Sequence, residues 1–140
     1  MAEELYHFIG GKRVPGKSGR FGDIYWPMVG EVAARVPLAS KNEVREAVEN
    51  AKAAQPAWAA LNPQVRARVF MKFVQLVQDE YDSLAELLAR EHGKTIPDAK
   101  GDIQRGIEVC EFAIGVPHLL KGEFTESAGP GIDMYSMRQP

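Results

Sequence analysis

The chain has 140 residues, of which 45% are hydrophobic and 26% charged, a composition typical of one globular domain rather than of a disordered segment. Its formal net charge of −2 argues against a nucleic-acid partner, which needs a clustered basic surface. No apolar run approaches the roughly 18–20 residues that span a bilayer, and the acidic start MAEELYHF is unlike a signal peptide. The single cysteine, Cys110, cannot form an internal disulfide, so we expect a protein of the reducing cytoplasm.

Residues 1–39 predict short β-strands. The runs 6–9 and 12–14 flank Gly10-Gly11, and such a glycine pair supplies the positive φ angles that a tight hairpin turn needs. Residues 31–38, EVAARVPL, alternate in part and predict a further strand, with Pro37 at an edge or an end.

Residues 40–122 have the period of helices. The first helix begins with a capping box, in which Ser40 and Glu43 satisfy otherwise unpaired backbone N–H groups. The expected starts are Ser40, Asn62 and Pro97, and the expected ends are Pro56, Gly93 and Gly115. The second helix is unusually long, and a break is expected near Asp82-Ser83.

Residues 123–140 return to loop and strand. We expect a loop over residues 127–131 and an extended run over 133–139. A strand at the end of a chain needs a partner edge, which indicates a truncated piece of a larger protein. The predicted class is therefore α+β: one truncated domain over 1–140, with a helical core, N-terminal strands and a C-terminal strand.

One segment, from Gly11 to Ser18, matches the phosphate-binding pattern G-x-x-x-x-G-K-[ST] letter for letter. A P-loop needs consecutive backbone N–H groups at the mouth of a helix, but Pro15 removes one of these groups. The following residues, GRFGDIYWP, have no helical period. A hairpin is therefore the favoured interpretation, and a nucleotide-binding loop remains the weaker alternative.

The remaining nucleophile and metal candidates are weak. Cys110 lies among aliphatic residues in the middle of a predicted helix, whereas a reactive thiolate needs a cationic or helix-N-terminal setting, so we expect a small buried hydrophobe. His7, His92 and His118 are widely separated, and no metal site is predicted.

The third predicted helix has two apolar faces and therefore packs against two bodies. The first apolar face consists of Ile103, Ile107, Cys110 and Ile114. The second begins at Arg105 and consists of Val109, Phe112 and Val116. The remaining face is polar and consists of Gln104, Glu108 and Glu111. Arg105 either pairs with Asp102 or Glu108 or offers its bidentate fork to a ligand carboxylate, and the spacing alone favours the ion pair.

The string EHGKTIPDAKGDIQRGIEVCEFAIGVPHLLKGE, residues 91–123, resembles the aldehyde dehydrogenases, and within them the CoA-acylating methylmalonate-semialdehyde (malonate-semialdehyde) group. FIGGKRV, GEVAARVPLAS, EVREAVENAKAAQPAW and NPQVRARVFMKF match the same family in the same order. The resemblance covers essentially the whole chain and implies the N-terminal portion of a Rossmann-like α/β enzyme that is several-fold longer.

The resemblance also implies a chemistry that uses NAD and coenzyme A: a cysteine thiolate attacks the aldehyde, NAD takes a hydride, and coenzyme A releases the acyl group. In the family pattern the nucleophile, the oxyanion-hole asparagine and the NAD site all follow Pro140, so no catalytic or cofactor-binding residue is expected here. Cys110 does not match the nucleophile's motif. The family's R-G-x-E arginine matches Arg105 and implies a substrate-carboxylate contact, and the tail GIDMYSMRQP resembles an arm that joins subunits.

The chain departs from the family pattern at Trp26 and Met28, where turn-friendly residues are usual. We therefore expect either an altered local turn or an altered contact surface there. A stand-alone interaction module that has kept the helices and lost the chemistry is the alternative function, and it predicts self-association through the exposed face of Val109, Phe112 and Val116.

Overall fold

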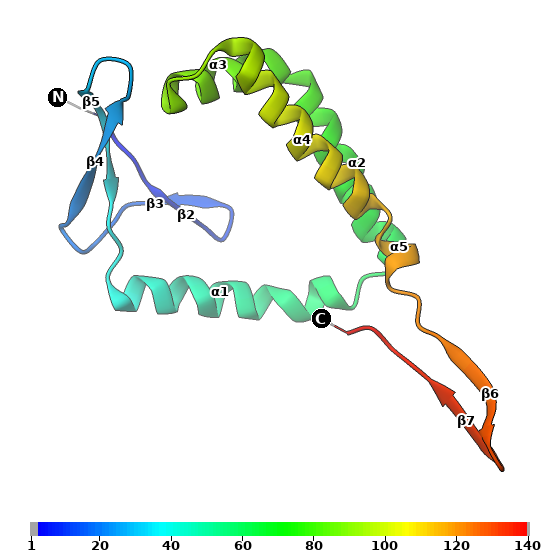
Figure 1. Cartoon of the computed structure of the whole chain (residues 1–140). Helices are drawn as coiled ribbons and strands as arrows, with labels where there is room; N and C mark the ends of the chain where they lie inside the picture. The colour runs from blue at the N-terminus through cyan, green and yellow to red at the C-terminus, as the bar shows by residue number, and fades with distance from the viewer. Residues whose placement is uncertain (1–2, 140) are drawn as a thin grey trace.

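The computed structural model describes residues 3–139. The N-terminal strands are β1 (Glu3–Glu4), β2 (His7–Ile9), β3 (Lys12–Val14), β4 (Phe21–Trp26) and β5 (Glu31–Pro37). The helices are α1 (Lys41–Ala59), α2 (Pro63–Asp79), α3 (Tyr81–His92), α4 (Ile96–Ile114) and α5 (Val116–Leu119), and the strands β6 (Phe124–Gly129) and β7 (Ile132–Tyr135) follow. Helix α1 links the strand region to an arm of α2, α3 and α4, and the β6–β7 hairpin projects from α5, near the junction of α1 and α2 (Figure 1).

The predicted N-terminal hairpin is confirmed. Strands β2 and β3 pair antiparallel, and the turn residues Gly10 and Gly11 have φ angles of 62° and 74°. Strand β5 is also confirmed and ends at Pro37. It pairs with β1 in parallel and with β4 in antiparallel orientation. Strands β1 and β4 were not predicted, because each depends on pairing with β5 rather than on a local pattern of its own.

The capping box of α1 is present: the Ser40 N–H donates to Glu43 Oε2 over 2.7 Å, and the Glu43 N–H donates to Ser40 Oγ over 3.3 Å. The predicted end at Pro56 is wrong, because α1 continues to Ala59. A proline removes only its own backbone donor, and the Pro56 carbonyl still accepts from the Ala60 N–H over 3.0 Å, so the last turn closes around it.

The break in the long second helix is confirmed, but it lies at Glu80, two residues before the predicted position. The Ser83 hydroxyl donates to the Glu80 carbonyl over 2.9 Å, but no side chain caps the start of α3. Helix α3 ends at Gly93 in the left-handed region, as predicted.

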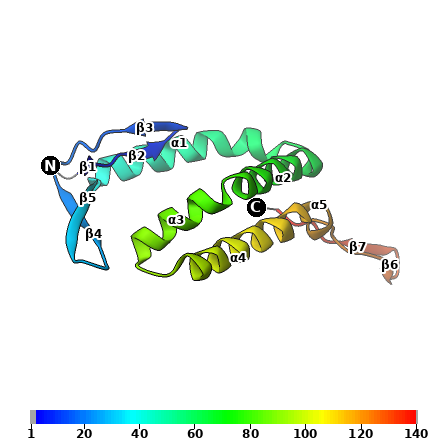
Figure 2. The same cartoon turned by 90° about the horizontal axis from the view of Figure 1, so that it is seen from above.

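Helix α4 packs against both α2 and α3, and α2 and α4 run along each other in both views (Figures 1 and 2).

The core of the helical arm is small. The contact between α3 and α4 is made by Ala85, Ala89 and Ala99, with Leu88 and Ile103 packed against them. The chain exposes 10896 Å², whereas a compact monomer of this mass exposes about 7200 Å². The helices therefore present more open surface than a self-contained domain of this size does.

The C-terminal strands differ from the prediction. Residues 127–131 do not form one loop, because β6 extends to Gly129 and only the tip of the hairpin turns. The irregularity lies at Ser127, which has φ 54° and whose N–H donates to Asp133 Oδ1 over 2.8 Å. The extended run ends at Tyr135, and its partner edge is the chain's own β6.

Candidate functional site

The exposed face of α4 carries the site residue that the sequence singles out. The Arg105 side chain is 64% exposed, and Val109 and Phe112 follow it at 69% and 71% exposure. Spacings of four and three residues place these side chains along one face of the helix. Val116, the last member of the predicted face, lies in α5 and is half-buried. The face is therefore a cation followed by an open apolar strip.

A chain of charged contacts holds Arg105 in place. Its Nη2 lies 3.3 Å from Asp102 Oδ1, while Lys94 donates to Asp102 Oδ2 and reaches Asp98 Oδ2 at 2.8 Å. These bonds raise the pKa of the Lys94 ammonium, and the bond from Lys94 lowers the pKa of the Asp102 carboxyl. Asp102 thus stays ionised as the ion-pair partner of the Arg105 guanidinium.

Of the two structural partners predicted for Arg105, Asp102 is the one that pairs with it. Glu108 instead accepts a hydrogen bond from Gln104 Nε2 over 3.3 Å. An exposed ion pair such as Arg105–Asp102 contributes only about 0.2–1 kcal/mol, and it is made through one nitrogen of the guanidinium. The pair leaves donors of Arg105 free to face a ligand.

Cys110 is half-buried rather than fully buried. It lines an open apolar pocket of about 360 Å³ between α2, α3 and α4, together with Phe73, Leu88, Ile103 and Ile107. This setting agrees with the predicted role of a small hydrophobe, because the thiol lies in the middle of α4 rather than at a helix N-terminus.

The Gly11–Ser18 segment does not have the geometry of a phosphate cradle. It forms β3 and a loop that leads directly to β4, so no helix begins behind it. The Lys17 N–H already donates to Glu43 Oε1 over 2.6 Å. Hydrogen bonds from the backbone N–H groups of Ser40 and Lys17 lower the pKa of the Glu43 carboxyl from 4.5 to about 2. The ionised Glu43 carboxylate at the start of α1 therefore accepts the Lys17 N–H, which in a P-loop would donate to a phosphate.

Among residues 3–139, no three His, Cys, Asp or Glu side chains gather in a way that could hold a metal ion. His7 lies beside Glu43, with 3.8 Å between Nε2 and Oε1, and the other two histidines lie in α3 and α5. Within the same residues, no helix combines the length and apolar character needed to cross a membrane.

Trp26 and Met28 lie at a closed turn between β4 and β5. The N–H groups of Val29 and Gly30 both donate to the Trp26 carbonyl, so the β4–β5 turn closes. The Arg90 guanidinium lies 5.7 Å from the Trp26 ring centroid, which joins this turn to α3. This contact could not be predicted from the sequence, because no local sequence pattern relates two residues that are 64 positions apart.

Comparison with known proteins extends these findings. The aldehyde dehydrogenase family model matches residues 14–140. A malonate-semialdehyde dehydrogenase from Pseudomonas aeruginosa is 41% identical over 97% of this chain, and the matching human methylmalonate-semialdehyde/malonate-semialdehyde dehydrogenase [acylating] is 41% identical over 95%. The chain spans only about a quarter of the length of these relatives.

Two solved structures share its fold over its whole length. A Sinorhizobium meliloti protein that carries the name methylmalonate-semialdehyde dehydrogenase, solved with NAD, is 68% identical with a TM-score of 0.95. The methylmalonate-semialdehyde dehydrogenase of Oceanimonas doudoroffii is 40% identical with a TM-score of 0.93, and this chain covers 28% of each of the two structures. The mixed arrangement of strands and helices is thus a portion of a larger known fold, and the chain belongs to the aldehyde dehydrogenase family.

Proposed function

We propose that these residues form the N-terminal part of an NAD-dependent, CoA-acylating dehydrogenase that oxidises malonate or methylmalonate semialdehyde to an acyl-CoA. The names of the most similar relatives support the substrate and the acylating reaction, and the solved relative with NAD supports the cofactor. The full-length enzyme here means a polypeptide of the relatives' length that contains these residues. We also propose a cytoplasmic location for it.

The proposed role of this region is to bind the substrate's carboxylate through Arg105. The observation that carries this proposal is the free edge of the Arg105 guanidinium at the head of the Val109–Phe112 strip. A semialdehyde of this class has a carboxylate at one end and a short carbon chain leading to the aldehyde. Arginine's fork holds the carboxylate in one orientation, and Val109, one helical turn further along α4, packs against the short carbon chain.

The reaction centre itself is proposed to lie outside these 140 residues. NAD binding in this class of fold needs a glycine-rich turn between a strand and a helix, and the Gly11–Ser18 loop has no helix behind it. The Cys110 thiol lines an apolar pocket, a setting that does not favour the reactive thiolate form. NAD, when bound elsewhere in the full-length enzyme, supplies the hydride acceptor, while this region binds and orients the substrate.

Assembly is a second part of the proposal. The β6–β7 hairpin is exposed along most of its length and projects away from the helices (Figure 1). We propose that it adds its edge to another subunit of a homo-oligomer. The stand-alone interaction module remains the second candidate function, and the exposed Val109 and Phe112 side chains favour it.

The test of the proposed reaction follows both products of the full-length enzyme. With malonate semialdehyde, NAD and coenzyme A, NADH and an acyl-CoA should form in equal amounts, measured by absorbance and by mass spectrometry. NADH formation with a free acid as the only product would contradict the acylating reaction, and no NADH at all would contradict the proposed enzyme class.

A further inference from the structure

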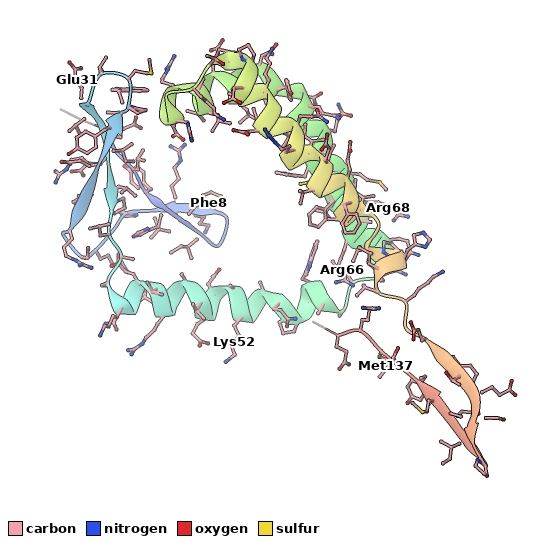
Figure 3. The ribbon with its side chains drawn as sticks, viewed as in Figure 1. Phe8, Glu31, Lys52, Arg66, Arg68 and Met137 are labelled. Carbon is pink, nitrogen blue, oxygen red and sulfur yellow. The ribbon has the colours of Figure 1, made fainter. Side chains whose placement is uncertain are left out.

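Arg66 is a half-buried arginine whose Nε has no hydrogen-bond partner among the described residues. It lies near the start of α2 and lines a pocket of about 290 Å³ with Trp58 of α1, Phe70 of α2, Phe112 of α4 and Val116 and Leu119 of α5. Its Nε is buried and has no hydrogen-bond partner within residues 3–139, and no carboxylate of that range forms an ion pair with it. Figure 3 shows Arg66 at the corner where the end of α1 meets the start of α2.

The other arginines show why this setting is unusual. Arg35 pairs with Asp23, and Arg105 pairs with Asp102. Arg13, Arg45 and Arg68 form no ion pair within the described residues, but all three are exposed to water. A half-buried cation loses part of its hydration, and an anionic acceptor with matching geometry compensates this loss most fully. A carboxylate is the acceptor that fits the planar fork of arginine.

The surroundings of the pocket indicate whether the carboxylate belongs to a small ligand or to a polypeptide. Trp58 is 40% exposed and Phe112 is 71% exposed, so two aromatic surfaces stay open beside the cation. The whole chain also exposes roughly half as much surface again as a compact monomer of its mass. It corresponds to only 28% of the solved relatives that share its fold. These observations favour a covering layer of polypeptide over a small free ligand.

We propose that Arg66 pairs with an aspartate or glutamate of a polypeptide segment that lies outside these 140 residues, and that an apolar neighbour of that residue fills the space between Trp58 and Phe112. The segment belongs to the full-length enzyme, so this inference rests on the proposed function only for the existence of the longer chain. Arg66 is then an internal anchor that docks the helical arm onto the remainder of the protein.

The experiment compares two variants in two lengths of chain. Arg66→Met removes the proposed anchor, and Arg68→Met is its matched control, since Arg68 lines a different surface of the same helix with Val65, Val69 and Lys72. In the full-length enzyme, Arg66→Met should lower the thermal unfolding midpoint by about 5 °C or more, and Arg68→Met should leave it nearly unchanged. In the 140-residue chain, Arg66→Met should not lower the midpoint, because the partner carboxylate is absent.

Two results would overturn the proposal. Equal shifts for the two variants in the full-length enzyme would show that Arg66 has no buried partner. A loss of stability in the 140-residue chain as large as in the full-length enzyme would place the partner inside this region. If full-length Arg66→Met does not fold, a crystal structure of the unmodified full-length enzyme decides, because a carboxylate oxygen must lie within hydrogen-bond distance of the guanidinium.

A small free carboxylate is the competing occupant. In a Trp26→Phe variant of the 140-residue chain, Trp58 is the only indole and its fluorescence reports on the pocket. Addition of 3-phenylpropionate should give the same fluorescence response whether residue 66 is arginine or methionine. A saturable change that Arg66→Met abolishes would identify a small-molecule site and overturn the polypeptide occupant. All readouts here are stability, structure or binding, so an inactive full-length enzyme would refute the proposed function without deciding this inference.

Discussion

Replacement of Arg105 by methionine in the full-length enzyme should lower kcat/KM for malonate semialdehyde by about 30-fold to 10³-fold, because a charge-assisted contact to the substrate is worth about 2–4 kcal/mol. Methionine keeps the length and the apolar stem of the side chain and removes only the charged fork. Arg105→Lys should recover part of this loss, since lysine restores the charge but not the bidentate geometry. Steady-state kinetics with saturating NAD and coenzyme A give both values.

The choice of substrate separates binding of the carboxylate from general damage. With 3-methylbutanal, in which an isopropyl group stands in place of the carboxylate, the same variant should lose less than about threefold. Equal losses on both aldehydes would show that Arg105 supports the fold and does not bind substrate. Arg68→Met serves as the matched arginine control and should leave both rates unchanged.

Replacement of Gly93 by alanine should destabilise the 140-residue chain by about 2–4 kcal/mol. Gly93 ends α3 with φ 79°, a conformation that costs a residue with a side chain about 1–2 kcal/mol. A Cβ at this position would also lie 2.9 Å from Pro27 Cγ and 3.3 Å from Pro27 Cβ, so the β4–β5 turn would have to move. Urea unfolding followed by circular dichroism measures the change.

The chain offers a control for each part of this effect. Gly30 has φ 74° with no atom within 4 Å of an added Cβ, so Gly30→Ala should show the conformational part alone. Combining Gly93→Ala with Pro27→Ala should recover the part that comes from the 2.9 Å contact with Pro27 Cγ. A Gly93→Ala variant no less stable than Gly30→Ala would contradict the packing of the turn against the end of α3.

The features that could be predicted from the sequence are those set by neighbouring residues. Gly10-Gly11 specifies its hairpin turn, Ser40 and Glu43 form a capping box within one helical turn, and Gly93 ends a helix because glycine tolerates positive φ. Arg105 could be singled out in the same way. Helical spacing places it at the head of an apolar face, and Asp102 stands three residues before it.

The features that could not be predicted depend on partners far along the chain. Strand β4 contains Gly22 and Asp23, both poor strand formers, and exists because β5 pairs with it. The contact between Trp26 and Arg90 joins a hairpin turn to a helix, and no local pattern records it. The pocket around Arg66 is assembled from four helices, so the burial of its unpaired Nε becomes visible only in three dimensions.

The most direct test of the central claim uses the 140-residue chain by itself. The claim is that these residues bind and frame the substrate, while the thiolate and the dinucleotide site come from polypeptide outside them. Incubated with malonate semialdehyde, NAD and coenzyme A, the purified chain should form no NADH above the enzyme-free background. Sustained NADH formation that Cys110→Ser abolishes would place the reaction centre inside the chain and contradict the account.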